Sequence, residues 1–313
     1  MKCLVISLLL LAGCLIYGYR VILPPGHAAV LPPSGYPLTL VDSYQRQVTL
    51  DQPPQRVISV APNITEIIFA LGKGTSLVGR TDYCDYPTAS RRVASIGNIT
   101  NPNIEKIVQL QPDLVIASTH FQLAVLEKLE ELGIKVVVFN EPESFAGIYT
   151  IIRQVGIALN AREQAAQLVA AMQQKVKRVR ETVKSAARPK VYYVVGFGKA
   201  GDFTAGKDTF IAKLIAMAGG INVANDTKGW HYSLEKLVQK NPDYIICSRY
   251  FNTKTGIAAA VGYRDLSAVK GGRLYEIDNN LLDRPGPRSA EGLETLARLL
   301  HPKLFSNFNE EQK

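Results

Sequence analysis

The chain has 313 residues, of which 47% are hydrophobic and 20% are charged, and it carries a formal net charge of +9. This composition is typical of a globular protein and excludes a largely disordered one. The basic residues are scattered except for a run between Lys175 and Arg180, which is the pattern of a solvated helix face, so the charge does not predict nucleic-acid binding.

Residues 1–18 predict export and attachment to a membrane. Lys2 precedes an apolar stretch that leads into the tetrapeptide LAGC at residues 11–14, which is the order of features in an export signal. The tetrapeptide resembles the bacterial lipobox, in which the cysteine is lipidated, so Cys14 is the candidate anchor. The alternative is an uncleaved signal anchor, although an apolar run of about 15 residues is short for a membrane span. Both alternatives place the fold outside the cytoplasm, in the periplasm or on the outer face of the cell membrane, with residues 19–35 as a tether.

Residues 36–160 predict an α/β lobe. An expected hairpin of residues 38–41 and 47–50 is followed by short apolar runs that alternate with helical patterns. In chain order, strands are expected at 57–60, 76–79, 114–117 and 136–139, and helices at 65–71, 104–110, 123–132 and 144–159. Such alternation of strands and helices is typical of a parallel sheet covered by helices.

A long helix is expected to link this lobe to a second one. Residues 162–186 contain no Gly or Pro, and a helix of this length spans roughly 35 Å. The linking segment is taken as residues 161–187. The α/β pattern restarts at 191–195 and continues, which predicts a second lobe over residues 188–306. The expected fold is therefore two Rossmann-like α/β lobes with parallel sheets, joined by a single long rigid helix.

An internal repeat supports the two lobes. The segment IEKIVQ at 104–109, followed by PDLVIAS, recurs as LEKLVQ at 234–239, followed by PDYIICS, at an offset of 235 − 105 = 130 residues. Each copy combines a helix, a Pro-Asp turn and a buried strand, and the Asp is expected to bond nearby backbone in the turn. The repeat predicts similarly built lobes with Glu105 and Glu235 in equivalent, exposed positions.

Four ordered segments resemble a known family. They are RVISVAPNITE at 56–66, TDYCDYP at 81–87, AGGINV at 218–223 and RPGPR at 284–288. Together they are similar to the solute-binding proteins that deliver vitamin B12, haem or ferric siderophores to ABC importers, and the second segment is most like the B12-binding type. The resemblance spans residues 36 to 302.

The resemblance implies a monomeric, extracytoplasmic binding protein with no enzymatic activity and no cofactor of its own. Its ligand would lie in the cleft between the lobes, and the stiff helix would keep lobe closure small. Its partner would be an ABC permease dimer with a cytoplasmic ATPase. In the family a glutamate on each lobe docks into arginine-lined pockets of the permease, and Glu105 and Glu235 match those positions.

Six side chains are candidates for contact with the ligand, namely Tyr83, His120, Phe121, Trp230, His231 and Arg284. The aromatic rings could stack on a flat macrocycle, and the two histidines are either possible axial ligands of its metal or solvated loop residues. Trp230 is alternatively a packing residue at a helix entry. Arg284 either binds a ligand anion or caps a helix. No directly bound metal ion is expected.

A corrinoid such as cobalamin is the favoured ligand, because the segment at 81–87 is most like the B12-binding type. Haem and a ferric siderophore are the alternatives. The chain has one tryptophan, whereas corrinoid-binding relatives tend to carry several. A chelatase-like or sensor protein on the same scaffold is a remote further alternative.

Two glycine patterns do not predict a nucleotide site. The GxGxxG at 196–201 is not followed directly by a helix, as a dinucleotide site requires. The GxxxxGK at 201–207 is followed by Asp208, where a phosphate-binding loop has Ser or Thr, and Asp208 is instead expected to cap a helix over 209–218. Cys84 and Cys247 are expected to be free thiols, and the chain has no grouped cysteines for a metal cluster.

Overall fold

The structure is a computed structural model that describes residues 35–118, 121–198 and 201–306. The fold belongs to the compact unit Tyr36–Lys313. Cys14 and most of the expected tether lie outside the described residues. Within the described part of the chain, no helix combines the length and the apolar character needed to cross a membrane.

The first lobe contains the expected hairpin and a parallel sheet. Strands β1 (Leu38–Val41) and β2 (Gln47–Leu50) pair antiparallel. The sheet has the order β5-β4-β3-β6-β7, with every pairing parallel. Its strands are β3 (Val57–Ser59), β4 (Leu77–Arg80), β5 (Ala94–Ser95), β6 (Leu114–Ala117) and β7 (Val136–Val138). The helices are α1 (Pro62–Ala70), α2 (Ile104–Gln109), α3 (Leu123–Glu131) and α4 (Phe145–Ala158), with short 3-10 turns η1 (Gly74–Ser76) and η2 (Thr88–Arg92).

Helix α1 begins three residues before its expected start at residue 65. Pro62 occupies the first turn, where a fixed φ suits the helix and the missing N–H would have no intrahelical partner. The apolar run alone does not reveal this first turn.

The second lobe repeats the parallel arrangement in the order β10-β8-β12-β13. Its strands are β8 (Lys190–Val194), β10 (Ile221–Asn222), β12 (Tyr244–Ser248) and β13 (Leu274–Ile277), and a separate antiparallel pair joins β9 (Asp202–Phe203) to β11 (His231–Tyr232). Its helices are α6 (Phe210–Met217), α7 (Leu234–Lys240), α8 (Thr253–Ala259), α9 (Ser267–Lys270), α10 (Asn280–Asp283) and α11 (Ser289–Leu300), followed by the turn η3 (Pro302–Leu304). The expected α/β fold with parallel sheets is confirmed.

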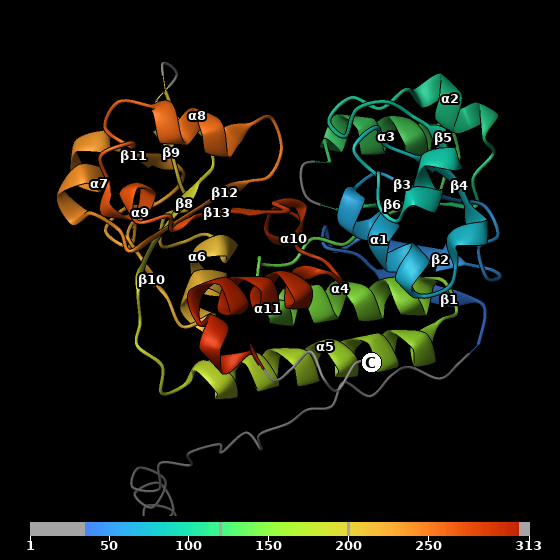
Figure 1. Cartoon of the computed structure of the whole chain (residues 1–313). Coiled ribbons are helices and arrows are strands. Elements are labelled where there is room, and N and C mark those ends of the chain that lie inside the picture. The colour runs from blue at the N-terminus through green and yellow to red at the C-terminus, as the bar shows by residue number, and fades with distance from the viewer. Residues whose placement is uncertain (1–34, 119–120, 199–200, 307–313) are drawn as a thin grey trace, which may run out of the picture. The chain divides into compact units, whose positions relative to one another are not determined.

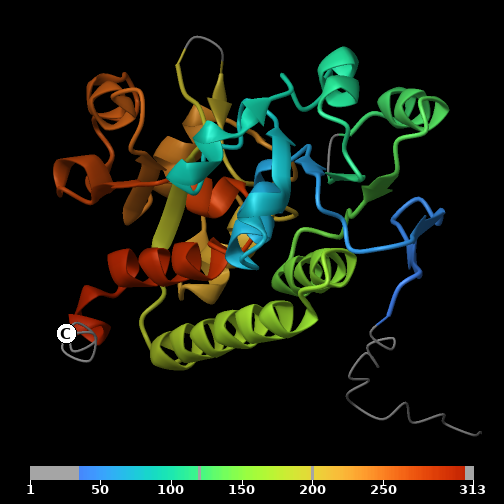
Figure 2. The same ribbon diagram turned by 90° about the vertical axis from the view of Figure 1, so that its right-hand side faces the viewer.

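The long helix α5 (Arg162–Val183) runs beneath both lobes (Figure 1). Its 22 residues correspond to about 33 Å. Helices α4 and α11 both pack against it, and in Figure 1 and Figure 2 both lie directly above it.

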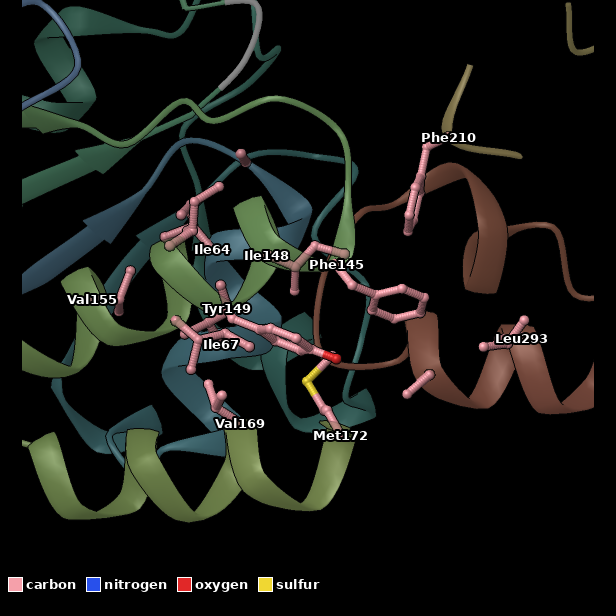
Figure 3. Close-up of a cluster of buried hydrophobic side chains, with 14 of the residues drawn as sticks. Ile64, Ile67, Phe145, Ile148, Tyr149, Val155, Val169, Met172, Phe210 and Leu293 are labelled. Atoms are coloured by element: carbon pink, nitrogen blue, oxygen red, sulfur yellow. The ribbon is translucent and has the colours of Figure 1, made fainter. Parts of the chain in front are cut away.

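The junction between the lobes is also a packed core. One continuous cluster of buried side chains includes residues of both lobes and of α5. Phe145 of α4 meets Phe210 of α6 edge to face, with ring centroids 5.5 Å apart, while Val169 and Met172 of α5 lie beside Tyr149 (Figure 3). Because this apolar surface is shared, separating the lobes would expose it to water. Helix α5 is therefore one part of a larger rigid junction.

The two copies of the repeat are built alike. Asn103 accepts a hydrogen bond from the backbone N–H of Lys106 at the start of α2, and Ser233 accepts one from that of Lys236 at the start of α7. Residue by residue, the pattern of buried and exposed positions is the same over 101–110 and 231–240. The prediction of two equivalent helix-turn-strand units is confirmed.

The aspartates of the two Pro-Asp turns bond backbone groups that are more distant in the chain than expected. Asp113 accepts hydrogen bonds from the backbone N–H groups of Gln55 and Arg56 at 2.7 and 2.8 Å, just before β3. Asp243 accepts one from the N–H of Lys190 at 2.7 Å, at the start of β8. Each aspartate thus fixes the beginning of a neighbouring strand more than fifty residues away in the chain, and not the backbone of its own turn.

Candidate ligand-binding site

A cavity of about 190 Å³ lies where the two lobes meet. Its walls come from the segments that leave the carboxyl ends of β3, β6 and β7, from α4, and from residues 283–285 of the second lobe, at the end of α10. The polar residues that line it include Asn63, Ser118, Glu141, Glu143, Asp283 and Arg284. The carboxyl edge of a parallel sheet is the usual place for a ligand. Because pockets for whole ligands are typically 300 Å³ or larger, this cavity fits one part of a larger molecule.

The wall formed by residues 141–143 is held against helix α4. A Cβ atom added at Gly147 would lie 2.3 Å from the carbonyl oxygen of Pro142, so only glycine permits this close approach. Ser144 caps the helix by accepting a hydrogen bond from the N–H of Gly147 at 3.1 Å. The segment that carries Glu141 and Glu143 is therefore fixed by the start of the helix that follows it.

Most of the described residues that line the cavity are apolar, and among the charged ones three acidic side chains, Glu141, Glu143 and Asp283, outnumber the single cation, Arg284. Glu141 and Glu143 form no salt bridge with any residue in the described part of the chain. Asp283 accepts hydrogen bonds from the Tyr193 hydroxyl at 3.2 Å and from the Asn279 amide at 2.7 Å. A ligand group that donates hydrogen bonds or carries positive charge would therefore be favoured there over an anion.

The one cation among the described lining residues is already paired. Arg284 donates to the carboxylate of Asp85 in the first lobe at 2.6 Å. Partial burial acts to raise the pKa of Asp85, but the hydrogen bond and charge of Arg284 hold that pKa below its usual value. This contact ties the two lobes together, and binding of a ligand anion by Arg284 stays a prediction.

A second ion pair joins the lobes beside the first. Arg288 donates two hydrogen bonds to Glu66 of α1, at 2.9 and 2.6 Å. The Glu66 side chain is 2% exposed and that of Arg288 is 12% exposed. The Arg288 guanidinium also lies 3.9 Å from the centre of the Tyr86 ring. A bidentate, buried pair of this kind fixes both distance and orientation.

The remaining predicted ligand residues are dispersed. Tyr83 is half exposed in the loop after β4, whereas Phe121 is only 6% exposed and packs in the core of the first lobe. His120 lies outside the described residues. Of the described candidates, only Arg284 lines the cavity.

His231 belongs to the small antiparallel sheet, and Trp230 directly precedes its strand β11. His231 starts β11, and its ring lies 4.5 Å from that of Phe203 on β9. Trp230 is 44% exposed, and its carbonyl accepts a hydrogen bond from the N–H of Thr204 at 2.7 Å. The sheet therefore fixes the backbone of both residues while leaving the indole accessible.

Glu105 and Glu235 occupy the first turns of α2 and α7 and are exposed. The hydroxyl of Ser233 donates a hydrogen bond to Glu235 and lowers the pKa of that carboxyl. Figure 1 shows α2 and α7 on different lobes. One exposed carboxylate on each lobe is the arrangement that the repeat predicts.

Sequence reasoning missed the aromatic pair that follows β12. Phe251 is 98% exposed and Tyr250 is 36% exposed. At the repeat offset of 130 residues, Phe251 is the residue equivalent to Phe121. Extending the comparison of the two copies by three residues beyond Ser248 would have revealed it.

Two further expectations have clear outcomes. Asp208 is not the helix cap: Thr209 accepts the hydrogen bond from Ala212 at the start of α6, and Asp208 accepts one from the N–H of Gly229 at 2.8 Å. Thr209 is adjacent to the helix and its hydroxyl reaches the free N–H groups, so the prediction was wrong by one residue.

Cys84 and Cys247 are buried free thiols, as expected, and burial raises the pKa of Cys247 to about 11.

Two parallel α/β lobes with a cavity at their facing carboxyl edges define a two-lobed ligand-binding protein. Residues 57–281 match the family model described as periplasmic binding protein. The chain belongs to this family, whose members are substrate-binding transport proteins and not enzymes.

Three similar proteins give the family context. An uncharacterised ABC transporter substrate-binding lipoprotein of Bacillus subtilis is 33% identical over 86% of this chain and 87% of its own length. A cobalamin-binding protein of Halobacterium salinarum is 31% identical over 89% of this chain and 78% of its own. The solved periplasmic haem-binding protein of Roseiflexus, in its apo form, is 26% identical and has a TM-score of 0.74, over 80% of this chain and 99% of that one.

Proposed function

We propose that the protein captures a corrinoid such as cobalamin in the cavity between its lobes and delivers it to an ABC permease. The observation that carries the choice of ligand is the excess of carboxylates over cations among the charged residues that line the cavity. A corrinoid presents neutral amide groups, which can donate hydrogen bonds to carboxylates, whereas haem presents carboxylates of its own. The similarity to a cobalamin-binding protein over 89% of the chain supports the same choice.

Haem is the second candidate, because a solved haem-binding protein shares the fold at a TM-score of 0.74. Tyr83 and His231 are exposed and offer an oxygen or a nitrogen as axial ligand. Against haem, its carboxylates would approach Glu141 and Glu143, and Arg284 is already engaged by Asp85.

Separate titrations with cyanocobalamin and with haem test the proposal, with binding followed by calorimetry and by the absorbance of the chromophore. We expect cyanocobalamin to bind more tightly. The double change Glu141→Gln with Glu143→Gln removes the negative charge of the cavity wall that would repel the haem carboxylates. It should therefore reduce the ratio of the affinity for cyanocobalamin to the affinity for haem. Glu131→Gln, an exposed change on α3 away from the cavity, is the matched control. Tighter haem binding by the unchanged protein would reject the corrinoid.

The proposal extends to the partners. Delivery requires contact with a permease dimer and its cytoplasmic ATPase, for which Glu105 and Glu235 are the candidate docking residues, one on each lobe. Attachment to the membrane through Cys14 would keep the protein close to that permease. The relative described as a substrate-binding lipoprotein supports both steps.

A further inference from the structure

Phe251 is the most exposed large hydrophobic side chain in the described part of the chain, with 98% of its surface accessible. Its backbone φ is 60°, and Asn252 follows with a φ of 53°. The left-handed region is common for asparagine but strongly disfavoured for a bulky residue such as phenylalanine. Exposure and backbone strain both oppose the stability of the ligand-free fold, and such strain gathers at functional sites.

The strained turn is held by a set of local hydrogen bonds. The Thr253 hydroxyl donates to the carbonyl oxygen of Tyr250 at 2.6 Å, and the Tyr250 hydroxyl donates to Asp278 at 3.3 Å. The N–H of Gly256 donates to the carbonyl of Asn252 at 3.0 Å. The backbone on both sides of residue 251 is therefore fixed, and it presents the side chain to solvent, with the ring of the adjacent Tyr250 6.4 Å away between centroids.

The turn lies at the same sheet edge that borders the cavity. Strand β12 pairs in parallel with β13, which places Ser248 beside Ile277, and Arg249 donates to Asp278 at 2.7 Å. The chain continues from β13 through α10 to Arg284 in the cavity wall. In Figure 1 the loop between β12 and α8 reaches toward the first lobe.

The repeat supplies an internal control for this position. Phe121 occupies the equivalent place after β6 and is 6% exposed, packed in the core of the first lobe. A phenylalanine at this point of the unit can therefore be buried. Its exposure in the second lobe is a property of that lobe's turn and is not imposed by the repeated scaffold.

We propose that Phe251 is an aromatic contact for the ligand, which packs on the apolar face of a planar macrocycle held between the lobes. The inference rests on the proposed function. Contact with the macrocycle would remove the ring from water and thereby offset the unfavourable exposure.

The test compares Phe251→Ala and Phe251→Gly with Val261→Ala, a change at another exposed hydrophobic residue of the second lobe that is 77% accessible. We expect both Phe251 variants to weaken cyanocobalamin binding about tenfold, from the loss of aromatic stacking and buried area. We expect Phe251→Gly to raise the midpoint of thermal unfolding without ligand, because glycine accepts a positive φ. Val261→Ala should change neither quantity.

The possible contrary results are distinct. Tight binding of cyanocobalamin that neither Phe251 variant alters would overturn the contact and leave the proposed cargo intact. Normal affinity combined with loss of cellular uptake would assign Phe251 to the permease instead, and so also overturn it. If the unchanged protein binds no cyanocobalamin, the proposed cargo fails, and the contact with a corrinoid fails with it.

Discussion

The two copies of the repeat are alike until their strands end, and there they diverge. After β6 the chain turns Phe121 into the core, and Ser118 accepts a hydrogen bond from Asn63 in the cavity wall. After β12 the chain exposes Phe251, and Ser248 instead donates to Asn279. Equivalent positions thus share a backbone scaffold but not an environment. The repeated units therefore supply a common scaffold, while the loops at their carboxyl ends place equivalent side chains in different environments.

The largest expected effect concerns whether the lobes behave as one unit. Replacing Arg288 by alanine would leave Glu66 buried without its bidentate partner, which we expect to destabilise the protein by about 3–5 kcal/mol. Urea unfolding would measure the loss. We expect the transition to stay single and to shift to lower urea concentration, because a continuous apolar core also joins the two lobes.

The matched control is Arg264→Ala. Arg264 pairs with Asp265 at 3.6 Å, and both side chains are more than half exposed, so we expect a loss below about 1 kcal/mol. Equal effects of the two changes would contradict the view that the Glu66–Arg288 pair holds the lobes together.

The second prediction tests the functional equivalence of the two repeat helices. Reversing the charge of both docking candidates, Glu105→Arg with Glu235→Arg, should abolish uptake in cells, because like charges would then face the arginine-lined permease pockets that the family resemblance implies. Ligand affinity should not change, since both glutamates are exposed on helices α2 and α7 and neither lines the cavity.

The two single charge reversals test whether both lobes contribute equally to docking. If the lobes dock equivalently, Glu105→Arg and Glu235→Arg should impair uptake to a similar degree. Normal uptake by the double variant would refute docking through these residues. A reversal of Glu163 in the first turn of α5 is the control for added positive charge.

The architecture was predictable from sequence because it rests on strong, local signals. Apolar runs that alternate with helical patterns predicted most strands and helices of the first lobe, and the absence of Gly and Pro over 162–186 predicted helix α5. The repeat indicated the second lobe's organisation, since its two copies share the hydrophobic period and each has a polar N-cap residue, Asn103 or Ser233. Such patterns are visible in the chain itself.

The site was much less predictable, because its contacts join residues far apart in the chain. Arg284 lies 199 residues from Asp85, and Arg288 lies 222 residues from Glu66. A phenylalanine occupies both position 121 and position 251, so the residue type alone does not distinguish the buried ring from the exposed one. Which side of a loop faces the core depends on the neighbouring elements, and this information appears only in the folded chain.

The smallest expected effect lies at the turns of the repeat and tests its equivalence most directly. Asp113→Ala removes the acceptor for two backbone N–H groups before β3, whereas Asp243→Ala removes the acceptor for one at the start of β8. A typical hydrogen bond contributes about 1 kcal/mol to stability. We therefore expect both changes to lower the free energy of unfolding, with the Asp113 change up to about twice as costly.

Hydrogen exchange would place each loss in its own lobe. Protection should fall at the amides of Gln55 and Arg56 in the first variant and at Lys190 in the second, because those are the groups that lose their acceptor. Asp51→Ala is a suitable control, since Asp51 is exposed and bonds only a lysine side chain among the contacts of the described residues. Loss of protection at these strand starts in the control as well would show that the aspartates do not fix them. If protection falls only before β3 in the Asp113 variant and only at the start of β8 in the Asp243 variant, the equivalent aspartate has the same structural role in both lobes.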